Sequence, residues 1–271
     1  MRMKKRSLLA ATLVSVSLAG CASVPLTQTG SISSYSALGP ESGNMGKART
    51  FVDAPAVSTA RTVALRPTGI TQTAASAATS EQDARLVANA VDRALCISLS
   101  DRFAVVRYGQ PADLVVQATV TSIVPTGKMA AGVSKVATLG TSAILPVGVP
   151  RLPWGLGGIA IEGEALDQHN SQRAAIVWAR GANSITNSAR ISEIGDAYGL
   201  AGNFGRQFGG MLVKAKSNPG MGLPSAERVG SVIGAKPSNS VCEDFGRGSG
   251  IKGLAGSIVG APPSWTDGGA R

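Results

Sequence analysis

Two apolar runs limit the fold of this chain more than any other feature. They are "GIAIEGEAL" (158–166) and "RAAIVWAR" (173–180), and the turn-rich stretch "DQHNSQ" separates them. Runs rich in Ile, Val and Ala that are bounded by Asp, Asn and Ser are typical of strands, and a short polar link favours an antiparallel hairpin. The chain is therefore expected to build an antiparallel sheet.

Three further stretches have strand character. They are "ARTVALRPT" (60–68), which Pro67 ends, "FAVVRY" (103–108) and "ADLVVQATVTSIV" (112–124). In the third stretch, Gln and Thr alternate with Val and Ala, so one face of this strand is expected to be half wet.

Two stretches have the period of a helix. The first begins at Ser80, which is spaced from Asp83 like a capping pair, and closes near Asp101. The second follows Ser192 and is rich in glycine, and each glycine costs about 1 kcal/mol relative to alanine in a helix interior. Such glycines indicate close packing against a sheet or another helix; they include Gly195, Gly199, Gly202, Gly205 and Gly209.

These elements predict an α+β fold. We expect an antiparallel sheet of four to five strands covered by two helices, in a single domain over residues 35–216. Residues 217–271 are rich in Gly, Pro and Ser, so this tail is expected to be irregular, with at most a short pinned segment near Cys242.

The amino-terminal residues are typical of a secretory signal peptide. Four cations precede a short apolar run, "LLAATLVSVSL" (8–18), which is too short to span a bilayer. The run ends in "LAGC" (18–21), which resembles a bacterial lipobox. This motif implies that residues 1–20 are removed and that Cys21 is lipidated. An ordinary signal peptide with an incidental cysteine is the alternative.

Lipidation would attach the mature protein to a membrane. Two or three acyl chains bind stably, whereas one binds only marginally. Ala22 follows the cysteine, and in proteins with this motif alanine there favours the outer membrane. Residues 21–34 are small and polar, and we expect a flexible, disordered tether with a reach of roughly 20 Å. The predicted location is the outer membrane, facing the periplasm.

The charge and the remaining cysteines fit this location. The formal charge is +10, of which the signal segment carries four cations, so the mature chain is about +6. Its scattered basic residues do not form the stripe that nucleic-acid binding requires. Cys96 and Cys242 could form a disulfide outside the cytoplasm, or Cys96 could be a small buried apolar residue; both readings stay open.

No catalytic signature is evident. The single histidine, His169, lies in a predicted turn without a nucleophile motif, and it is not clustered with Cys96 or Cys242 as a zinc ligand. Glu162 and Glu164 share one strand face and could serve acid–base chemistry in a cleft, but the wet face of an amphipathic strand is favoured. No catalytic residue, metal or cofactor is predicted.

An apolar loop over 126–158 is unusually long for a compact domain. Its core, 136–158, has one charge, Arg151, and is broken by three prolines. It could pack on its own domain, contact a partner or a second copy, or dip into lipid. The prolines exclude a continuous membrane helix. The candidate contact residues are Leu145, Val147, Leu152 and Trp154.

Several blocks together resemble an uncharacterised bacterial lipoprotein family, domain of unknown function 3313. The likeness covers roughly residues 31–214 and depends on the order of the blocks, none of which is a catalytic signature. The blocks are "SYSALGP", "VDRALCISLSDRFAVV", "ADLVVQATVTSIVPT", "GGIAIEGEALDQHNSQRAAIVWARGA" and "DAYGLAGNFGRQF". The resemblance implies an exported lipoprotein with a compact α/β domain and no known activity.

The expected function follows from location rather than chemistry. We expect a non-enzymatic binding or assembly module, held to the membrane by its lipid, with an envelope protein or a second copy as partner. The alternative is a self-assembling membrane ring or pore component that inserts segment 129–158. An envelope hydrolase is a more distant third, and would require Glu162, Glu164 or His169 to gather in a pocket.

Overall fold

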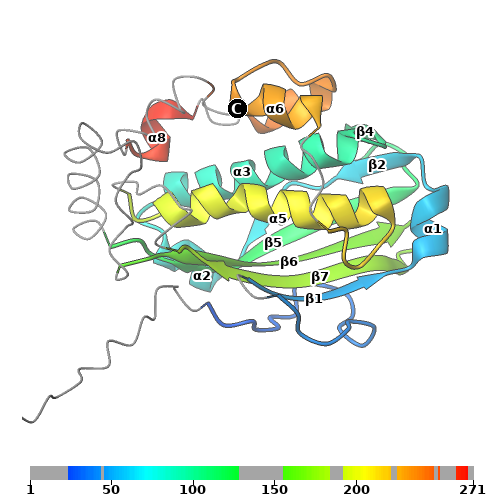
Figure 1. Cartoon of the computed structure of the whole chain (residues 1–271), viewed down its shortest axis with the longest axis horizontal. Helices are drawn as coiled ribbons and strands as arrows, with labels where there is room; N and C mark the ends of the chain where they lie inside the picture. Colours follow the sequence, from blue (N-terminus) through cyan, green and yellow to red (C-terminus); the bar gives the residue numbers. More distant parts are fainter. Residues whose placement is uncertain are drawn as a thin grey trace, which may run out of the picture.

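The computed structural model describes residues 24–43, 46–127, 155–183, 192–220, 225–246, 250 and 261–267. A single sheet runs through these residues, with two long helices on one of its faces (Figure 1). The strands are β1 (Lys47–Val52), β2 (Thr62–Leu65), β3 (Gly69–Ile70), β4 (Ala104–Arg107), β5 (Leu114–Val124), β6 (Gly158–Asp167) and β7 (Gln172–Gly181). The helices are α1 (Ala54–Thr59), α2 (Gln72–Ala77), α3 (Glu81–Ser100), α5 (Gly195–Lys214), α6 (Ala226–Val232), η1 (Ser240–Phe245) and α8 (Pro263–Thr266).

The sheet is mixed and has seven strands, which corrects the expected antiparallel sheet of four to five. Its order is β1-β7-β6-β5-β2-β4, with β3 paired to β5. The strands β1, β7, β6 and β5 are antiparallel neighbours, whereas β2 runs parallel to β4 and β5. Helix α3 causes this parallel pairing, because a chain that crosses from β2 to β4 through a helix returns in the same direction.

The predicted hairpin is present. Strands β6 and β7 are antiparallel, and Asp167 closes the turn by accepting from the backbone N–H of His169 at 2.8 Å and of Ser171 at 2.9 Å. Its carboxylate also pairs with Arg173 at 2.7 Å. The hydrogen bonds from Ser171 and Arg173 lower the pKa of Asp167.

Helix α3 begins where the capping pattern predicts. The Ser80 hydroxyl accepts from the backbone N–H of Asp83 at 3.1 Å, and Glu81 and Asp83 add negative charge to the first turn. Its apolar side packs into the main core together with α5 and the helix-facing side of the sheet.

Two glycines of α5, Gly205 and Gly209, have the packing role that the sequence suggested, whereas Gly199 does not. A Cβ on Gly205 would lie 2.5 Å from the Cβ of Ala94, and a Cβ on Gly209 would lie 2.5 Å from the Cβ of Ser98. Glycine therefore lets α5 lie directly against α3, the helix beside it in Figure 1.

The tail has more regular structure than expected. It forms α6, η1 and α8, which lie on the α3 side of the molecule (Figure 1). Near the end of the described chain, Asp267 forms a buried ion pair with Arg93 of α3 at 2.8 Å, and Tyr198 of α5 donates to Asp267. The local Gly and Pro content of the tail gave no sign of these distant partners.

Candidate functional site: the sheet face covered by the N-terminal segment

Glu162 and Glu164 lie on the sheet face that points away from α3 and α5. Gly163 between them faces the helices, where a Cβ would lie 2.9 Å from the Phe208 ring. The two glutamates are only 1% and 2% exposed, so the expectation of a wet strand face is wrong for them. The reason is that another part of the chain covers this face.

Residues 24–39, here called the N-terminal segment, form that cover. This segment is dark blue in Figure 1 and runs beneath β6 and β7. Ile32 and Leu38 pack against Ala175 and Val177, while Val24 packs against Ala160 and Ala179. The expectation of a flexible tether over residues 21–34 is therefore wrong for residues 24–34, because they have an apolar surface to lie on.

Glu162 binds this segment through both carboxylate oxygens. One oxygen accepts from the Thr29 backbone N–H at 2.8 Å, and the other from the Ser31 N–H at 3.0 Å and the Tyr35 hydroxyl at 2.7 Å. Burial of Tyr35 and its hydrogen bond to Glu162 raise the pKa of the phenol. Backbone N–H groups of a segment that belongs to no helix or strand thus find carboxylate acceptors in place of water.

Glu164 continues the same pattern. It accepts from the backbone N–H of Ser33 at 2.9 Å and from the Ser33 hydroxyl at 2.6 Å. The side-chain amides of Gln117 and Gln172 donate to it at 2.6 and 2.8 Å. We call Glu162 and Glu164 the carboxylate clamp; their oxygens hold the chain in place and do not point into an open cleft.

The contacts also fix the direction of the N-terminal segment. Val24 lies at the start of β6, Thr29 and Ser31 reach Glu162, and Ser33 reaches Glu164, so the segment runs alongside β6 in the same direction. At its first residue the fit is tight, because a Cβ on Gly158 would come within 2.3 Å of Val24 Cγ2. The segment therefore starts at one defined end of the sheet.

We call this the anchor end. It is formed by the last residue of β5, the first of β6 and the last of β7, namely Val124, Gly158 and Gly181. The chain that leaves Val24 toward Cys21 departs from here. Cys21 itself lies outside the described residues.

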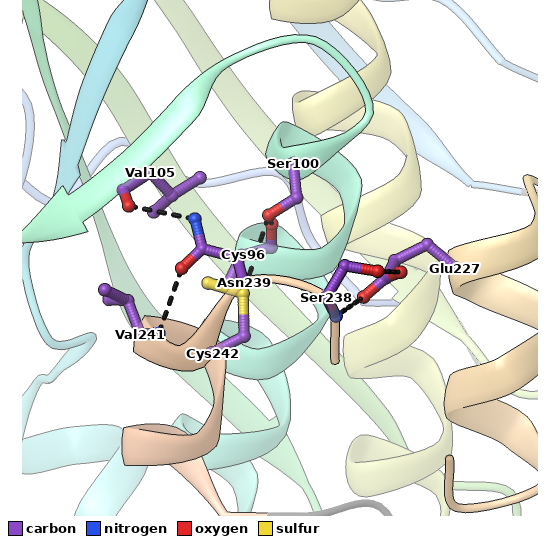
Figure 2. Close-up of a disulfide and its surroundings, with 8 residues drawn as sticks. All are labelled: Cys96, Ser100, Val105, Glu227, Ser238, Asn239, Val241 and Cys242. Carbon is purple, nitrogen blue, oxygen red and sulfur yellow. Dashed lines mark hydrogen bonds between the residues drawn. A yellow bond between two sulfur atoms is a disulfide. The ribbon is translucent and has the colours of Figure 1, made fainter. Parts of the chain in front are cut away.

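Cys96 and Cys242 are joined by a disulfide, one of the two alternatives that the sequence left open. The bond links α3 to η1 with a Cα–Cα distance of 5.6 Å, and both residues are fully buried. Figure 2 shows the surroundings: Ser100 donates to the Cys96 carbonyl at 2.9 Å, and the Asn239 amide donates to the Val105 carbonyl of β4 at 2.9 Å. The disulfide thus fixes the tail to α3, and the Asn239 hydrogen bond fixes it to β4 at the edge of the sheet.

The other predicted residues are not gathered at this site. His169 is exposed in the β6–β7 turn, at the opposite end of β6 from Val24. The candidate contact residues Leu145, Val147, Leu152 and Trp154 lie outside the described residues, as does most of segment 129–158. Sequence reasoning missed Thr29, Ser31 and Tyr35; the signal for them was two glutamates within an otherwise apolar strand.

Neither a metal-binding cluster nor a membrane-spanning helix is found in the described ranges. No group of three His, Cys, Asp or Glu side chains in them is placed to hold a metal ion. Among the same residues, no helix is both long and apolar enough to cross a bilayer.

Comparison with known proteins identifies a family. A family model described as "Protein of unknown function (DUF3313)" matches residues 27–208, about two thirds of the chain. The chain belongs to the DUF3313 family. The DUF3313 match contains the carboxylate clamp and its partners from Thr29 to Tyr35, and it ends before Cys242 and the described part of the tail that Cys242 fixes.

Solved structures give distant similarities. A PelC dodecamer from Paraburkholderia phytofirmans carrying one substitution is 13% identical, with a TM-score of 0.38, covering 65% of this chain and 100% of that chain. A second PelC dodecamer from the same organism is 12% identical, with a TM-score of 0.37, covering 64% of this chain and 99% of that chain. None of the curated proteins matches this DUF3313 chain.

Proposed function

We propose that this DUF3313 protein is a lipid-anchored protein of the outer membrane that faces the periplasm and acts as a non-enzymatic binding or assembly module. The basic and apolar start of the sequence and the "LAGC" motif at residues 18–21 support export and lipidation of Cys21. The observation that carries the proposal is that Val24, three residues after this cysteine, is buried and belongs to the segment that the carboxylate clamp fixes.

The disulfide supports the same location. Stable disulfides persist in oxidising compartments such as the bacterial periplasm and are rare in the cytosol. The bond between Cys96 and Cys242 is buried and joins residues 146 positions apart, so it is a part of the fold rather than a surface feature.

Lipidation is tested by expressing full-length protein in bacteria fed a labelled fatty acid. The wild type should incorporate the label, gain the mass of the acyl chains and sediment with outer membranes. Cys21→Ser should lose all three properties, whereas Ala22→Ser keeps the thiol and should retain label and mass. A Cys21→Ser protein that still carries acyl chains and sediments with membranes would refute the proposal.

The proposed partner is a protein of the envelope or a second copy of this chain. Segment 129–158 is the contact that the sequence favours. Its described flanks lie side by side, since the Gly127 backbone N–H donates to the Gly155 carbonyl at 2.8 Å, and Gly158 already belongs to β6. Residues 129–154 can therefore be replaced by a short glycine link that leaves the sheet intact.

Crosslinking in intact cells tests the partner. The wild type should give a specific crosslinked product that mass spectrometry identifies as another envelope protein or as the same chain. The variant lacking 129–154 should lose this product while unfolding at the same urea concentration as the wild type. An unchanged product from the variant would remove this segment as the contact.

A further inference from the structure

The covalent distance between the lipidated cysteine and the folded domain is short. Val24 is 3% exposed and fixed against Ala160 and Ala179 at the anchor end. Three peptide units connect it to Cys21, and a fully extended chain covers at most about 3.6 Å per residue, so the two Cα atoms lie within about 11 Å. The chain is too short to hold the domain away from the headgroups.

The carboxylate clamp keeps the N-terminal segment from detaching from the sheet and so lengthening this connection. Lengthening it by a few residues would pull Val24 off Ala160, and lengthening it further would remove Thr29 and Ser31 from Glu162. The second step would remove hydrogen-bond donors from Glu162, which is only 1% exposed. A buried charge that loses its donors is costly. The short connection is therefore a stable property of the fold.

We infer that the anchor end of the sheet rests directly on the lipid headgroups, so that the domain stands on the membrane in one orientation. This inference rests on the proposed lipidation of Cys21. The opposite end, with the β6–β7 turn and its exposed His169, then points into the periplasm. The two ends of β6 are nine residues apart, about 30 Å at the usual rise per residue.

The acyl chains and the short connection produce this contact, and surface charge is not required for it. Lys47 of β1, which pairs with Ala179 near the anchor end, is in a salt bridge with Glu41 at 3.3 Å. The orientation should therefore persist on vesicles of zwitterionic phosphatidylcholine and at high salt, since salt screens exposed charges but not covalent reach.

Two variants of the lipidated full-length protein, each with one added cysteine, measure the orientation. Lys47→Cys puts a thiol near the anchor end and Gln168→Cys puts one in the far turn; both side chains are exposed. The native Cys96 and Cys242 are paired and buried, so a fluorophore labels only the new thiol. The vesicles are phosphatidylcholine containing a lipid with a spin-labelled headgroup as quencher.

We expect a large loss of fluorescence from position 47 and a small loss from position 168, because the two positions lie about 25 Å apart along the strands. Equal losses, or a larger loss from position 168, would overturn the inference. Failure of the proposed lipidation gives a different result, since the protein would then lack acyl mass and would not float with the vesicles.

A longer connection is the matched control. About twelve Gly and Ser residues inserted between Ser23 and Val24 add a flexible reach of roughly 20 Å and leave the sequence up to Cys21 intact. This variant should float with vesicles as the wild type does, but the loss of fluorescence from position 47 should fall toward that from position 168. A loss that does not change on insertion would show that something other than the short connection sets the orientation.

Discussion

Asp92 carries the clearest single-residue consequence of the fold. It lies on the buried side of α3, and each of its carboxylate oxygens is 3.0 Å from the backbone N–H of Thr68, the residue that follows β2 and Pro67. Burial raises the pKa of Asp92 to about 6, and the hydrogen bonds from Thr68 act in the opposite direction. Relative to the unfolded chain, the folded state therefore favours the protonated form of this carboxyl.

This preference makes stability depend on pH. Because the pKa is higher in the folded than in the unfolded chain, the contribution of Asp92 is fully present below about pH 4 and is lost as the pH rises through 6. Asp92→Asn stays neutral. Between pH 4 and pH 7.5, the unfolding free energy of the wild type should fall by about 2–3 kcal/mol relative to that of the variant. Urea unfolding of both proteins at the two pH values measures this, and a difference that does not vary with pH would contradict it.

At the scale of the element, the contact between α3 and α5 explains why a helix tolerates so many glycines. Gly205 meets Ala94 so closely that an added Cβ would lie 2.6 Å from the backbone carbonyl carbon of that residue. Gly199 is on the same helix but exposed, and nothing lies within 4 Å of the position that its Cβ would take. The two glycines therefore differ in role although the sequence pattern does not separate them.

Alanine substitutions distinguish these roles. Gly205→Ala should lower the free energy of unfolding by about 1–3 kcal/mol, because overpacking against a backbone that cannot move aside costs more than the helix propensity returns. Gly199→Ala should raise it by up to about 1 kcal/mol, the propensity difference alone. Urea denaturation of the two variants tests the pair, and equal effects would be inconsistent with this packing.

Local pattern was sufficient for some elements and insufficient for others. Helix α3 was predictable because its cap and its apolar period lie within twenty residues. Strand β1 was missed because "KARTFV" mixes charge with apolar residues and needs β7 beside it to become a strand. The clamp was missed for the same reason, since its donors in the N-terminal segment lie more than 120 positions from its acceptors. Long-range partners, not local propensity, decide these parts.

At the scale of the whole molecule, the tail is fastened to the DUF3313 domain at several separate points. The disulfide joins η1 to α3, Asp267 pairs with Arg93, and exposed Asp244 pairs with Arg107 of β4 at 2.7 Å. The buried contacts matter most, because an exposed ion pair contributes about 0–1 kcal/mol. The domain and its tail should therefore unfold together while the disulfide is intact.

Breaking the disulfide tests this coupling. A bond that closes a loop of 146 residues stabilises the fold by up to about 5 kcal/mol in the chain-entropy model. Replacing Cys96 and Cys242 together by alanine should lower the unfolding free energy by a large part of this amount and expose the tail to proteases before residues 27–208. Reductant should lower the unfolding free energy of the wild type toward that of the variant and should not change that of the variant. Identical wild-type and variant stabilities would contradict the coupling.

The contacts between residues 29–33 and the clamp also order events in time. They join positions 131 to 133 residues apart, so the N-terminal segment has no surface to lie on until β6 has been delivered. In a chain exported from its amino terminus, as proposed, Cys21 emerges more than a hundred residues before β6. Once β6 is in place, the buried Val24 lies only three residues along the chain from this cysteine. Acylation would thus precede folding, and a chain that folded first would offer modifying enzymes a crowded substrate.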